Sequence, residues 1–211
     1  MPEPREIILE HSGRGCELRE AFFRANADRL ADLSRTAAVA LARGGKLLFC
    51  GNGGSAADSQ HLAAEFVNRF MMERPPLPAI ALTTDTSILT AIGNDYSYGQ
   101  VFEKQVLALG RPGDMLFGLS TSGGSENVLA AMRAAQEKEL TVIGFCGADG
   151  EKMRPYCREV FNVPEKNTAL IQEIHITLGH LLCRLTDYYL FEAVAELQPF
   201  LNDQDQGPDK P

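Results

Sequence analysis

The chain has 211 residues, 45% of them apolar and 23% charged, with a formal net charge of −8. This length suits one domain with its own hydrophobic core, and an acidic chain without a basic stripe disfavours a nucleic-acid partner. The polar first residues, the absence of an apolar run of roughly 20 residues, and five cysteines without C-x-x-C spacing lead us to expect no signal peptide, no membrane contact and a cytoplasmic location.

The first half of the chain alternates helical and strand-like segments. Apolar residues recur at three- and four-residue steps and predict a helix over 7–43, which Gly44-Gly45 ends. The apolar run 47–50 predicts a short buried strand, and a glycine-rich loop then leads into a helix over 55–70. Residues 79–82 predict the second strand, and 85–109 a region of loop and helix.

The second half repeats this alternation. Residues 115–119 predict a strand, a second glycine-rich loop follows, and the spacing predicts a helix over 128–138. Two more strands are predicted over 141–145 and 160–163, and a long final helix over 169–190. The polar segment 202–211 is typical of a disordered tail.

Strands that alternate with helices indicate a parallel sheet covered on both faces. We therefore predict a single α/β domain over 1–211, with its sheet-and-helix core over 45–191. The expected architecture is a three-layer αβα sandwich with a five-stranded parallel sheet, flavodoxin/Rossmann-like. The first and last helices are longer than such a sheet needs, so we expect them to lie in an oligomer interface.

The second glycine loop follows the third predicted strand and has the sequence Ser120-Thr121-Ser122-Gly123-Gly124-Ser125. Glycine lets main-chain N–H groups approach an anion, and the start of the next helix adds partial positive charge. Each of the four hydroxyls can donate to one phosphate oxygen. The alternative is a serine-capped helix start without a ligand, but four hydroxyls with two glycines favour a phosphate site.

The first glycine loop, Gly51-Asn52-Gly53-Gly54-Ser55, makes the same strand-to-helix turn and fits the pattern G-x-G-x-x-A. A dinucleotide site expects an acidic residue about 20 positions further on. Here the first acid after the next strand is Asp85, 34 residues after Gly51, and the P-loop lysine is absent. Neither NAD nor ATP is therefore favoured, and we expect this loop to bind sugar hydroxyls.

The helix after the first loop carries His61 and Glu65, whose spacing of four places them on one helical face. A lone pair of this kind is more often a surface pair. The final helix, however, carries further ligand-type side chains, namely Gln172, Glu173, His175 and His180. Gln172 and His180 lie near 80° apart on the helical wheel and could converge on one site. Two imidazoles, a carboxylate and an amide suit zinc or a similar divalent ion, but the sequence alone does not bring the two helices together.

These motifs, in this order, resemble the sugar isomerase (SIS) domain proteins, and within them the phosphoheptose isomerase family. The resemblance covers about 10–191 and rests on the first loop with His61 and Glu65, Gly93-Asn94-Asp95, the second loop from Ser120 to Gly123, and Ile171-Gln172-Glu173-x-His175. It implies conversion of sedoheptulose 7-phosphate to D-glycero-D-manno-heptose 7-phosphate through a cis-enediol. This is the first step toward nucleotide-activated heptose for lipopolysaccharide and other surface glycans.

The resemblance also implies the site and the assembly. The family is a cytoplasmic homotetramer whose sites are shared between subunits, with a sugar phosphate as ligand and one Zn²⁺ per subunit. Its metal ligands map onto His61, Glu65, Gln172 and His180. Its substrate contacts map onto Asn52, Gly53, Gly54, Glu65, Asn94, Asp95, Ser120, Thr121, Ser122, Ser125 and Gln172.

Moving a carbonyl from C2 to C1 requires a base, an acid and a group that stabilises the enediolate oxygen. We assign Glu65 as the base and His180 as the acid, with the metal polarising the carbonyl. A carboxylate bound tightly to a metal is a poor base, so Glu65 is a ligand, the base or both in exchange. We interpret His175 as a packed histidine rather than a neighbour of the metal ligands, and place His11 on the surface.

Two positions depart from the family pattern: Leu170 replaces a frequent arginine before Ile-Gln-Glu, and Glu126 adds a negative charge beside the proposed phosphate loop. Either could shift the preference among sugar phosphates. The alternatives are a non-catalytic SIS adaptor of replication initiation, an SIS enzyme for another ketose or aldose phosphate, and a sugar-phosphate sensor. The presence of Glu65 and His180 favours an enzyme over the adaptor.

Overall fold

The computed structural model describes residues 1–202, and apart from Asn202 the predicted tail lies outside this range. The strands are β1 (Leu47–Gly51), β2 (Ala79–Ala81), β3 (Met115–Ser120), β4 (Thr141–Cys146) and β5 (Glu159–Asn162). The α-helices are α1 (Pro4–Ala42), α2 (Gly54–Val67), α3 (Thr86–Asp95), α4 (Glu103–Leu109), α5 (Glu126–Glu137), α6 (Thr168–Asp187) and α7 (Gln198–Asn202). Short 3₁₀ turns occupy Tyr98–Gln100, Arg154–Tyr156 and Val194–Glu196, and a π-helical turn spans Tyr188–Glu192.

The five strands form one sheet in the order β2-β1-β3-β4-β5, and every neighbouring pair is parallel. The predicted five-stranded parallel sheet is thereby confirmed. β1 and β3 are direct neighbours, with Gly51 opposite Leu119 at their carboxyl ends. The two glycine loops therefore leave the sheet side by side.

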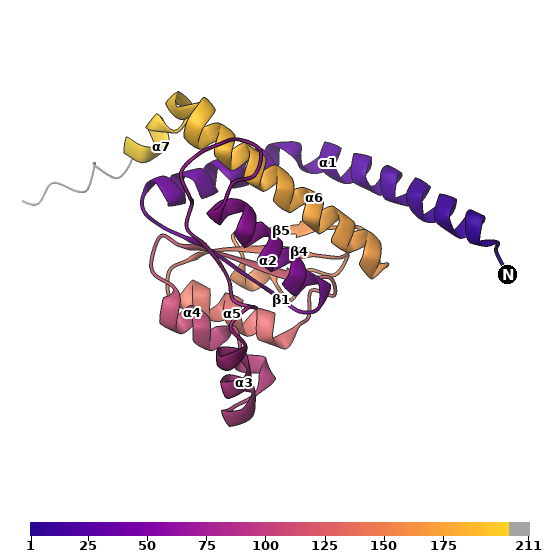
Figure 1. Ribbon diagram of the computed structural model, residues 1–211, viewed down its shortest axis with the longest axis horizontal. Coiled ribbons are helices and arrows are strands. Elements are labelled where there is room, and N and C mark those ends of the chain that lie inside the picture. Colours follow the sequence, from indigo (N-terminus) through magenta and orange to yellow (C-terminus); the bar gives the residue numbers. More distant parts are fainter. Residues whose placement is uncertain (203–211) are drawn as a thin grey trace, which may run out of the picture.

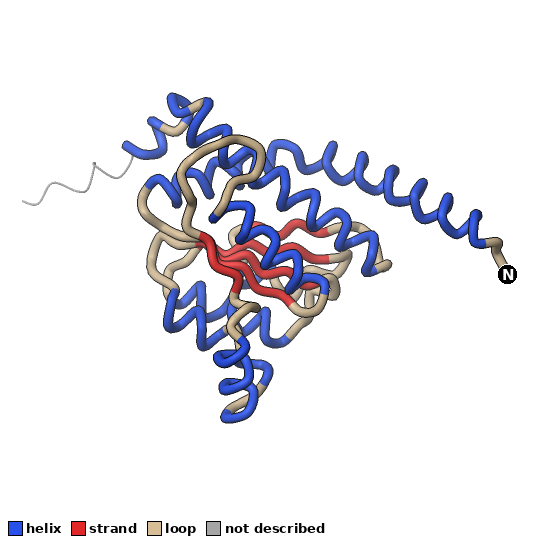
Figure 2. Tube along the Cα trace, viewed as in Figure 1, coloured by secondary structure: helices blue, strands red, loops and turns tan. Residues whose placement is uncertain are grey.

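Helices cover both faces of the sheet, as the three-layer prediction requires. α1, α2 and α6 lie on one face and α4 and α5 on the other, with the strands between them (Figures 1 and 2). A hydrophobic core lies on each face of the sheet, and successive strand residues point to opposite faces. Phe49 belongs to the core under α2 and α6, and Leu48 to the core under α5. Phe49 and Phe117 stack with centroids 4.9 Å apart.

Element boundaries differ from the sequence expectation where local capping decides them. α1 begins at Pro4, earlier than predicted, because proline suits the first helical turn and Glu3 and Glu6 form a capping box. α2 ends at Val67, earlier than predicted. Asn68 leaves the helical conformation, and the Arg74 side chain donates to the carbonyl oxygens of Phe66 and Asn68.

The amino-terminal part of α1 extends beyond the rest of the molecule (Figure 1). Ile7, Ile8 and Leu9 are 53–67% exposed there. Further along, α1 packs against α6. The position of these two long helices in an oligomer interface stays a prediction. Within the described residues, no helix is both long and apolar enough to cross a membrane.

Candidate functional site

The two glycine loops occupy the topological switch point of the sheet. β1 continues into α2 on one face, whereas β3 continues into α5 on the opposite face. In open parallel sheets, ligands bind in the crevice at the carboxyl ends of the strands where this reversal occurs. The fold alone therefore marks the space between the two loops as the candidate site.

The hydroxyls of the second loop converge. Ser120 Oγ lies 2.8 Å from Ser125 Oγ and 3.3 Å from Ser122 Oγ. Gly123 adopts a φ of +66°, and a Cβ there would lie 2.0 Å from the carbonyl oxygen of Asp149, so the turn requires glycine. Three donors gathered within one turn at the start of α5 are suited to an anion.

Two charged side chains border the second loop. The ammonium group of Lys152 would be 3.8 Å from a Cβ built at Gly124, so a cation lies beside this part of the loop. The carboxyl group of Glu126 lies near Gly99 and lines a surface cavity with Arg133 and Glu137. The negative charge of Glu126 thus shares this cavity with the positive charge of Arg133.

The first loop is joined to the start of α5, directly after the second loop, by a reciprocal amide pair. Asn52 Nδ2 donates to Asn127 Oδ1, and Asn127 Nδ2 donates to Asn52 Oδ1, both at 2.8 Å. The Tyr98 hydroxyl donates to the same Asn52 oxygen at 3.1 Å. Gly53 turns the chain with a φ of +56° into α2, and Gly54 lies so close to Gln172 that a Cβ would be 2.4 Å from its Nε2. The Asn52 side chain therefore sets the spacing between the two loops.

His61, Glu65 and His180 lie together on the exposed side of α2 and α6. His61 Nε2 is 2.8 Å from His180 Nε2 and 3.5 Å from Glu65 Oε1. The spacing of four on α2 brings the first two together, and the packing of α6 along α2 adds the third. Because one imidazole nitrogen has to accept the hydrogen bond, at least one of the two rings is neutral.

The His180 ring is held from two sides. The Phe70 ring stacks on it at 5.4 Å, and the His61 ring meets it edge-on at 5.1 Å. Burial and, after it, the neighbouring His61 lower the pKa of His180, while Glu65 acts in the opposite direction. A neutral His180 can accept or donate a proton through its two ring nitrogens.

The donor set suits zinc chemically, but the rings stand in hydrogen-bond contact. Two tetrahedral zinc–imidazole bonds would separate the nitrogens by roughly 3.3 Å, more than the 2.8 Å observed here. Accordingly, no three His, Cys, Asp or Glu side chains within residues 1–202 are arranged as a metal-ligand group. Gln172 lies two turns earlier on α6, with its amide against Gly54. A small rotation of one exposed ring would open the space between His61 and His180.

The sequence of residues 14–147 matches the family model described as the SIS domain. The phosphoheptose isomerase of Nitratidesulfovibrio vulgaris (strain Hildenborough) is 64% identical over 201 residues, covering 95% of this chain and 97% of the relative. The chain belongs to the phosphoheptose isomerase family.

Solved structures of the phosphoheptose isomerase family agree with this assignment. Those from Neisseria gonorrhoeae and Francisella tularensis superpose with TM-scores of 0.82 and 0.81, at 44% and 35% identity. Each comparison covers 88% of this chain and 99% of the other. The chain is thus an enzyme of this family, with the SIS fold that its motifs predicted.

Other predicted site residues lie apart from the histidine cluster. Asn94 and Asp95 are exposed at the end of α3 and hydrogen-bond to each other at 2.8 Å. Glu173 pairs with His11 of α1 at 2.8 Å, and both side chains are 41% exposed, so His11 lies at the surface as predicted and is paired with α6. Leu170, the departure from the family pattern, is 1% exposed and packs near Gly15 of α1.

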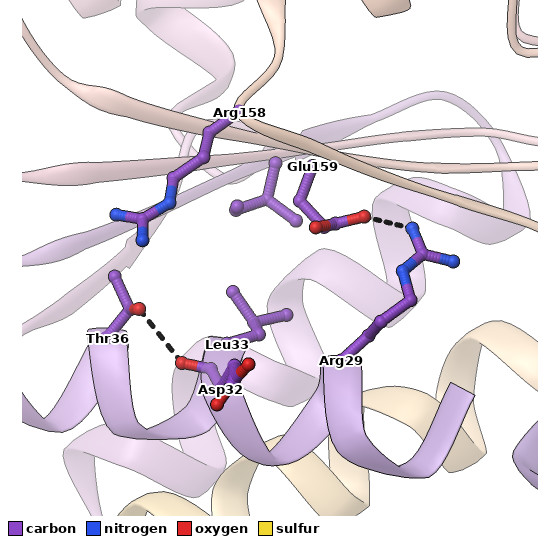
Figure 3. A pocket seen from close by; sticks show the side chains of 7 residues that line it. Arg29, Asp32, Leu33, Thr36, Arg158 and Glu159 are labelled. Atoms are coloured by element: carbon purple, nitrogen blue, oxygen red, sulfur yellow. Dashed lines mark hydrogen bonds and ion pairs between the residues drawn. The ribbon is translucent and has the colours of Figure 1, made fainter.

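His175 is the packed histidine that the sequence analysis favoured. It is fully buried, its Nε2 lies 3.2 Å from the Cys146 carbonyl oxygen, and burial lowers its pKa to about 4. A cavity of about 140 Å³ lies at the amino end of β5, among Arg29, Arg158 and Glu159 (Figure 3). This cavity is at the opposite end of the strands from the glycine loops and contains none of the predicted site residues.

The sequence analysis missed four residues around the site: Asn127, Tyr98, Lys152 and Arg74. None belongs to a motif with its own spacing, and each acts through a partner far away in sequence. Asn127 alone carried a signal, since it directly follows the helix start after the serine loop. The others required the folded arrangement.

Proposed function

We propose that the chain interconverts sedoheptulose 7-phosphate and D-glycero-D-manno-heptose 7-phosphate, the step that supplies heptose phosphate for activation to a nucleotide sugar. The observation that carries the proposal is the cluster of His61, Glu65 and His180 on α2 and α6, about two helical turns after the first glycine loop at the switch point. The second loop offers anion donors, and this cluster offers acid and base groups. A linear sugar phosphate needs both.

In the proposed reaction, the Glu65 carboxylate takes a proton from C1, and the C1–H electrons form a C1=C2 double bond. The carbonyl oxygen on C2 receives a proton from His180, which gives the cis-enediol. His180, having given up its proton, then takes the O1 proton as the C1=O double bond forms, and the C1=C2 electrons take the proton from Glu65 at C2, which completes the aldose. Glu65 Oε1 lies 3.5 Å from His61 Nε2, and we assign the second oxygen as the base.

The remaining predicted residues bind and orient the substrate. The hydroxyls of Ser120, Ser122 and Ser125, with Thr121 beside them, hold the phosphate, and Lys152 supplies the balancing charge. The main chain of Gly53 and Gly54 faces the sugar. We further propose that Asn52, Asn94 and Asp95 contact sugar hydroxyls, Asn94 and Asp95 from the exposed end of α3.

We propose His61, Glu65, Gln172 and His180 as the residues that hold one zinc ion. When bound, zinc would act as a Lewis acid on the substrate carbonyl. The donor types support this set, although the two imidazoles first have to separate. We also propose a homotetramer, with the exposed Ile7, Ile8 and Leu9 of α1 covered by a second subunit.

The decisive experiment incubates the purified protein with sedoheptulose 7-phosphate and follows the aldose proton signals by NMR. Glu65→Gln should lower turnover by roughly 10²–10⁴-fold, because it removes the base while keeping the side-chain volume. Glu73→Gln is the matched control, since Glu73 is an exposed carboxylate on the loop after α2. Sedimentation should show the same assembly for both variants.

Three outcomes would count against the proposal. Turnover by Glu65→Gln at the wild-type rate would remove Glu65 as the base. Binding of the ketose phosphate by the wild-type protein without conversion would favour a sensor or adaptor. Conversion of a shorter ketose phosphate in preference to the heptulose would assign another substrate.

A further inference from the structure

The two helices that carry the predicted catalytic groups run side by side in the same direction. Gly54 at the start of α2 faces Gln172 near the start of α6. About two turns further along the helices, Leu62 of α2 lies against Gly179 of α6. A Cβ built at Gly179 would be 2.3 Å from Leu62 Cδ2. His61 and His180 are the next residues to this second contact, so the spacing of the helices decides the distance between their rings.

The carboxyl ends of both helices then meet at one arginine, Arg74, in the segment between α2 and β2. Its Nε donates to Asp187 Oδ1, in the last residue of α6, at 2.9 Å. Its two amino groups donate to carbonyl oxygens of Glu65, Phe66, Asn68 and Pro75 at 2.8–3.2 Å. Both ionised side chains are nearly inaccessible, at 1% and 2% exposed.

This arrangement has a clear electrostatic reason. The carboxyl end of α2 carries carbonyl groups without partners in the helix, and with them partial negative charge. α6 continues into the π-helical turn, so at this place it contributes the Asp187 carboxyl group rather than free carbonyls. The guanidinium group, with five N–H donors in a fixed plane, can bind the end of α2 and the Asp187 side chain at once, which a lysine cannot.

We infer that Arg74 and Asp187 form a positioning clamp that holds α2 and α6 in the register at which Glu65, His61 and His180 meet. Arg74 donates directly to the carbonyl oxygen of Glu65, the proposed base, at 3.0 Å. Neither clamp residue belongs to the proposed set of substrate contacts or metal ligands. The clamp acts on the site through the backbone of Glu65 and through the helix that ends at Asp187.

The inference rests on the proposed function of the histidine cluster, so its test needs readouts other than turnover. The variants are Arg74→Met and Asp187→Asn, which remove one charge each at similar volume, and Arg74→Lys, which keeps the charge but loses the planar fork. Asp114→Asn is the matched control. Asp114 is 3% exposed and binds Lys46 in the same way, but at the amino ends of β1 and β3.

Three measurements are made on each folded variant below its unfolding transition. Zinc affinity, by competition with a chromogenic chelator, should fall 10–100-fold in Arg74→Met and Asp187→Asn but less than twofold in Asp114→Asn. In metal-free protein, the ¹⁵N signals of the His61 and His180 ring nitrogens should lose the signature of their mutual hydrogen bond. With the sugar phosphate, kcat should fall while KM stays close to wild type, because the serine loop is untouched.

A double variant separates positioning from stability. Replacing a buried ion pair by apolar residues of similar size often leaves stability unchanged, so Arg74→Met with Asp187→Leu is expected to fold but to keep the defects in zinc affinity and ring signals. Wild-type affinity and ring signals in the single and double variants would overturn the clamp. If the wild-type protein shows no isomerisation, the proposed function fails, whereas the ring signals still decide whether the clamp exists.

Discussion

Gly179 is a point of close contact between α6 and α2, and its replacement by alanine tests the packing beneath the histidine cluster. The new Cβ would lie 2.3 Å from Leu62 Cδ2, 2.6 Å from Cδ1 and 3.0 Å from Cγ. Leu62 is fully buried and cannot swing into solvent. The two helices therefore have to separate by a fraction of an ångström, next to His61 and His180.

The magnitude follows from two opposing effects. Forcing an extra methyl group into a packed core costs about 1–3 kcal/mol, whereas replacing glycine by alanine within a helix returns up to about 1 kcal/mol. We expect Gly179→Ala to lower the free energy of unfolding by about 1–2 kcal/mol, or the Tm by roughly 2–8 °C for a chain of this size. Because the wider helix spacing also moves His180, the proposed acid, away from Glu65, the proposed base, kcat should fall as well.

The assay combines urea unfolding with turnover on sedoheptulose 7-phosphate. Gly13→Ala in α1 is the control, since a Cβ there meets nothing within 4 Å and should leave stability unchanged or raised. The double variant Leu62→Ala with Gly179→Ala should lose less free energy of unfolding than the sum of the two single losses. The smaller side chain at position 62 leaves room for the new methyl group at position 179. A Gly179→Ala protein as stable and as active as Gly13→Ala would refute the packing argument.

Two further predictions concern buried polar groups. Burial lowers the pKa of His175 from 6.5 to about 4, so the neutral ring stabilises the fold fully above pH 6.5. That contribution, up to about 3 kcal/mol, is lost as the pH falls from 6.5 through 4, because the unfolded chain binds the proton first. Urea unfolding at pH 7 and pH 4.5 should show the loss in the wild type and much less of it in His175→Gln; equal pH slopes would contradict the assignment. Asn127→Asp replaces a donor by a carboxylate oxygen facing Asn52 Oδ1, and should lower stability by about 1–3 kcal/mol and raise KM for the sugar phosphate. Unchanged KM and thermal unfolding would show that the amide pair does not set the loop spacing.

Most of the fold could be predicted because its signals are local. Buried parallel strands appear as short apolar runs, and each glycine loop marks the strand-to-helix turn after β1 and β3. The helix ends were less accurate, since the end of α2 depends on Arg74, which also binds Asp187 at a sequence separation of 113 residues. No periodicity can show such a contact.

The site divides in the same way. The spacing of four predicted that His61 and Glu65 share a helical face, and the structure places them 3.5 Å apart. His180 joined them in the sequence analysis through the family resemblance alone, because the approach of α6 to α2 depends on Gly179 and Leu62. Glu173, next to Gln172 in the motif, binds His11 of α1 instead. The two residues are 162 positions apart in the sequence, so no local spacing pattern could predict their contact.

The amide pair between the loops also bears on how long the protein stays chemically intact. Asn52 precedes Gly53, and asparagine followed by glycine is the dipeptide most open to attack of the backbone nitrogen on the side-chain amide, which releases ammonia and leaves an acid. Here Asn127 and Tyr98 hold the Asn52 amide by both its oxygen and its nitrogen. The same contacts that space the loops therefore slow deamidation of Asn52. Storage life should shorten in any variant in which the Asn52 amide loses these hydrogen bonds.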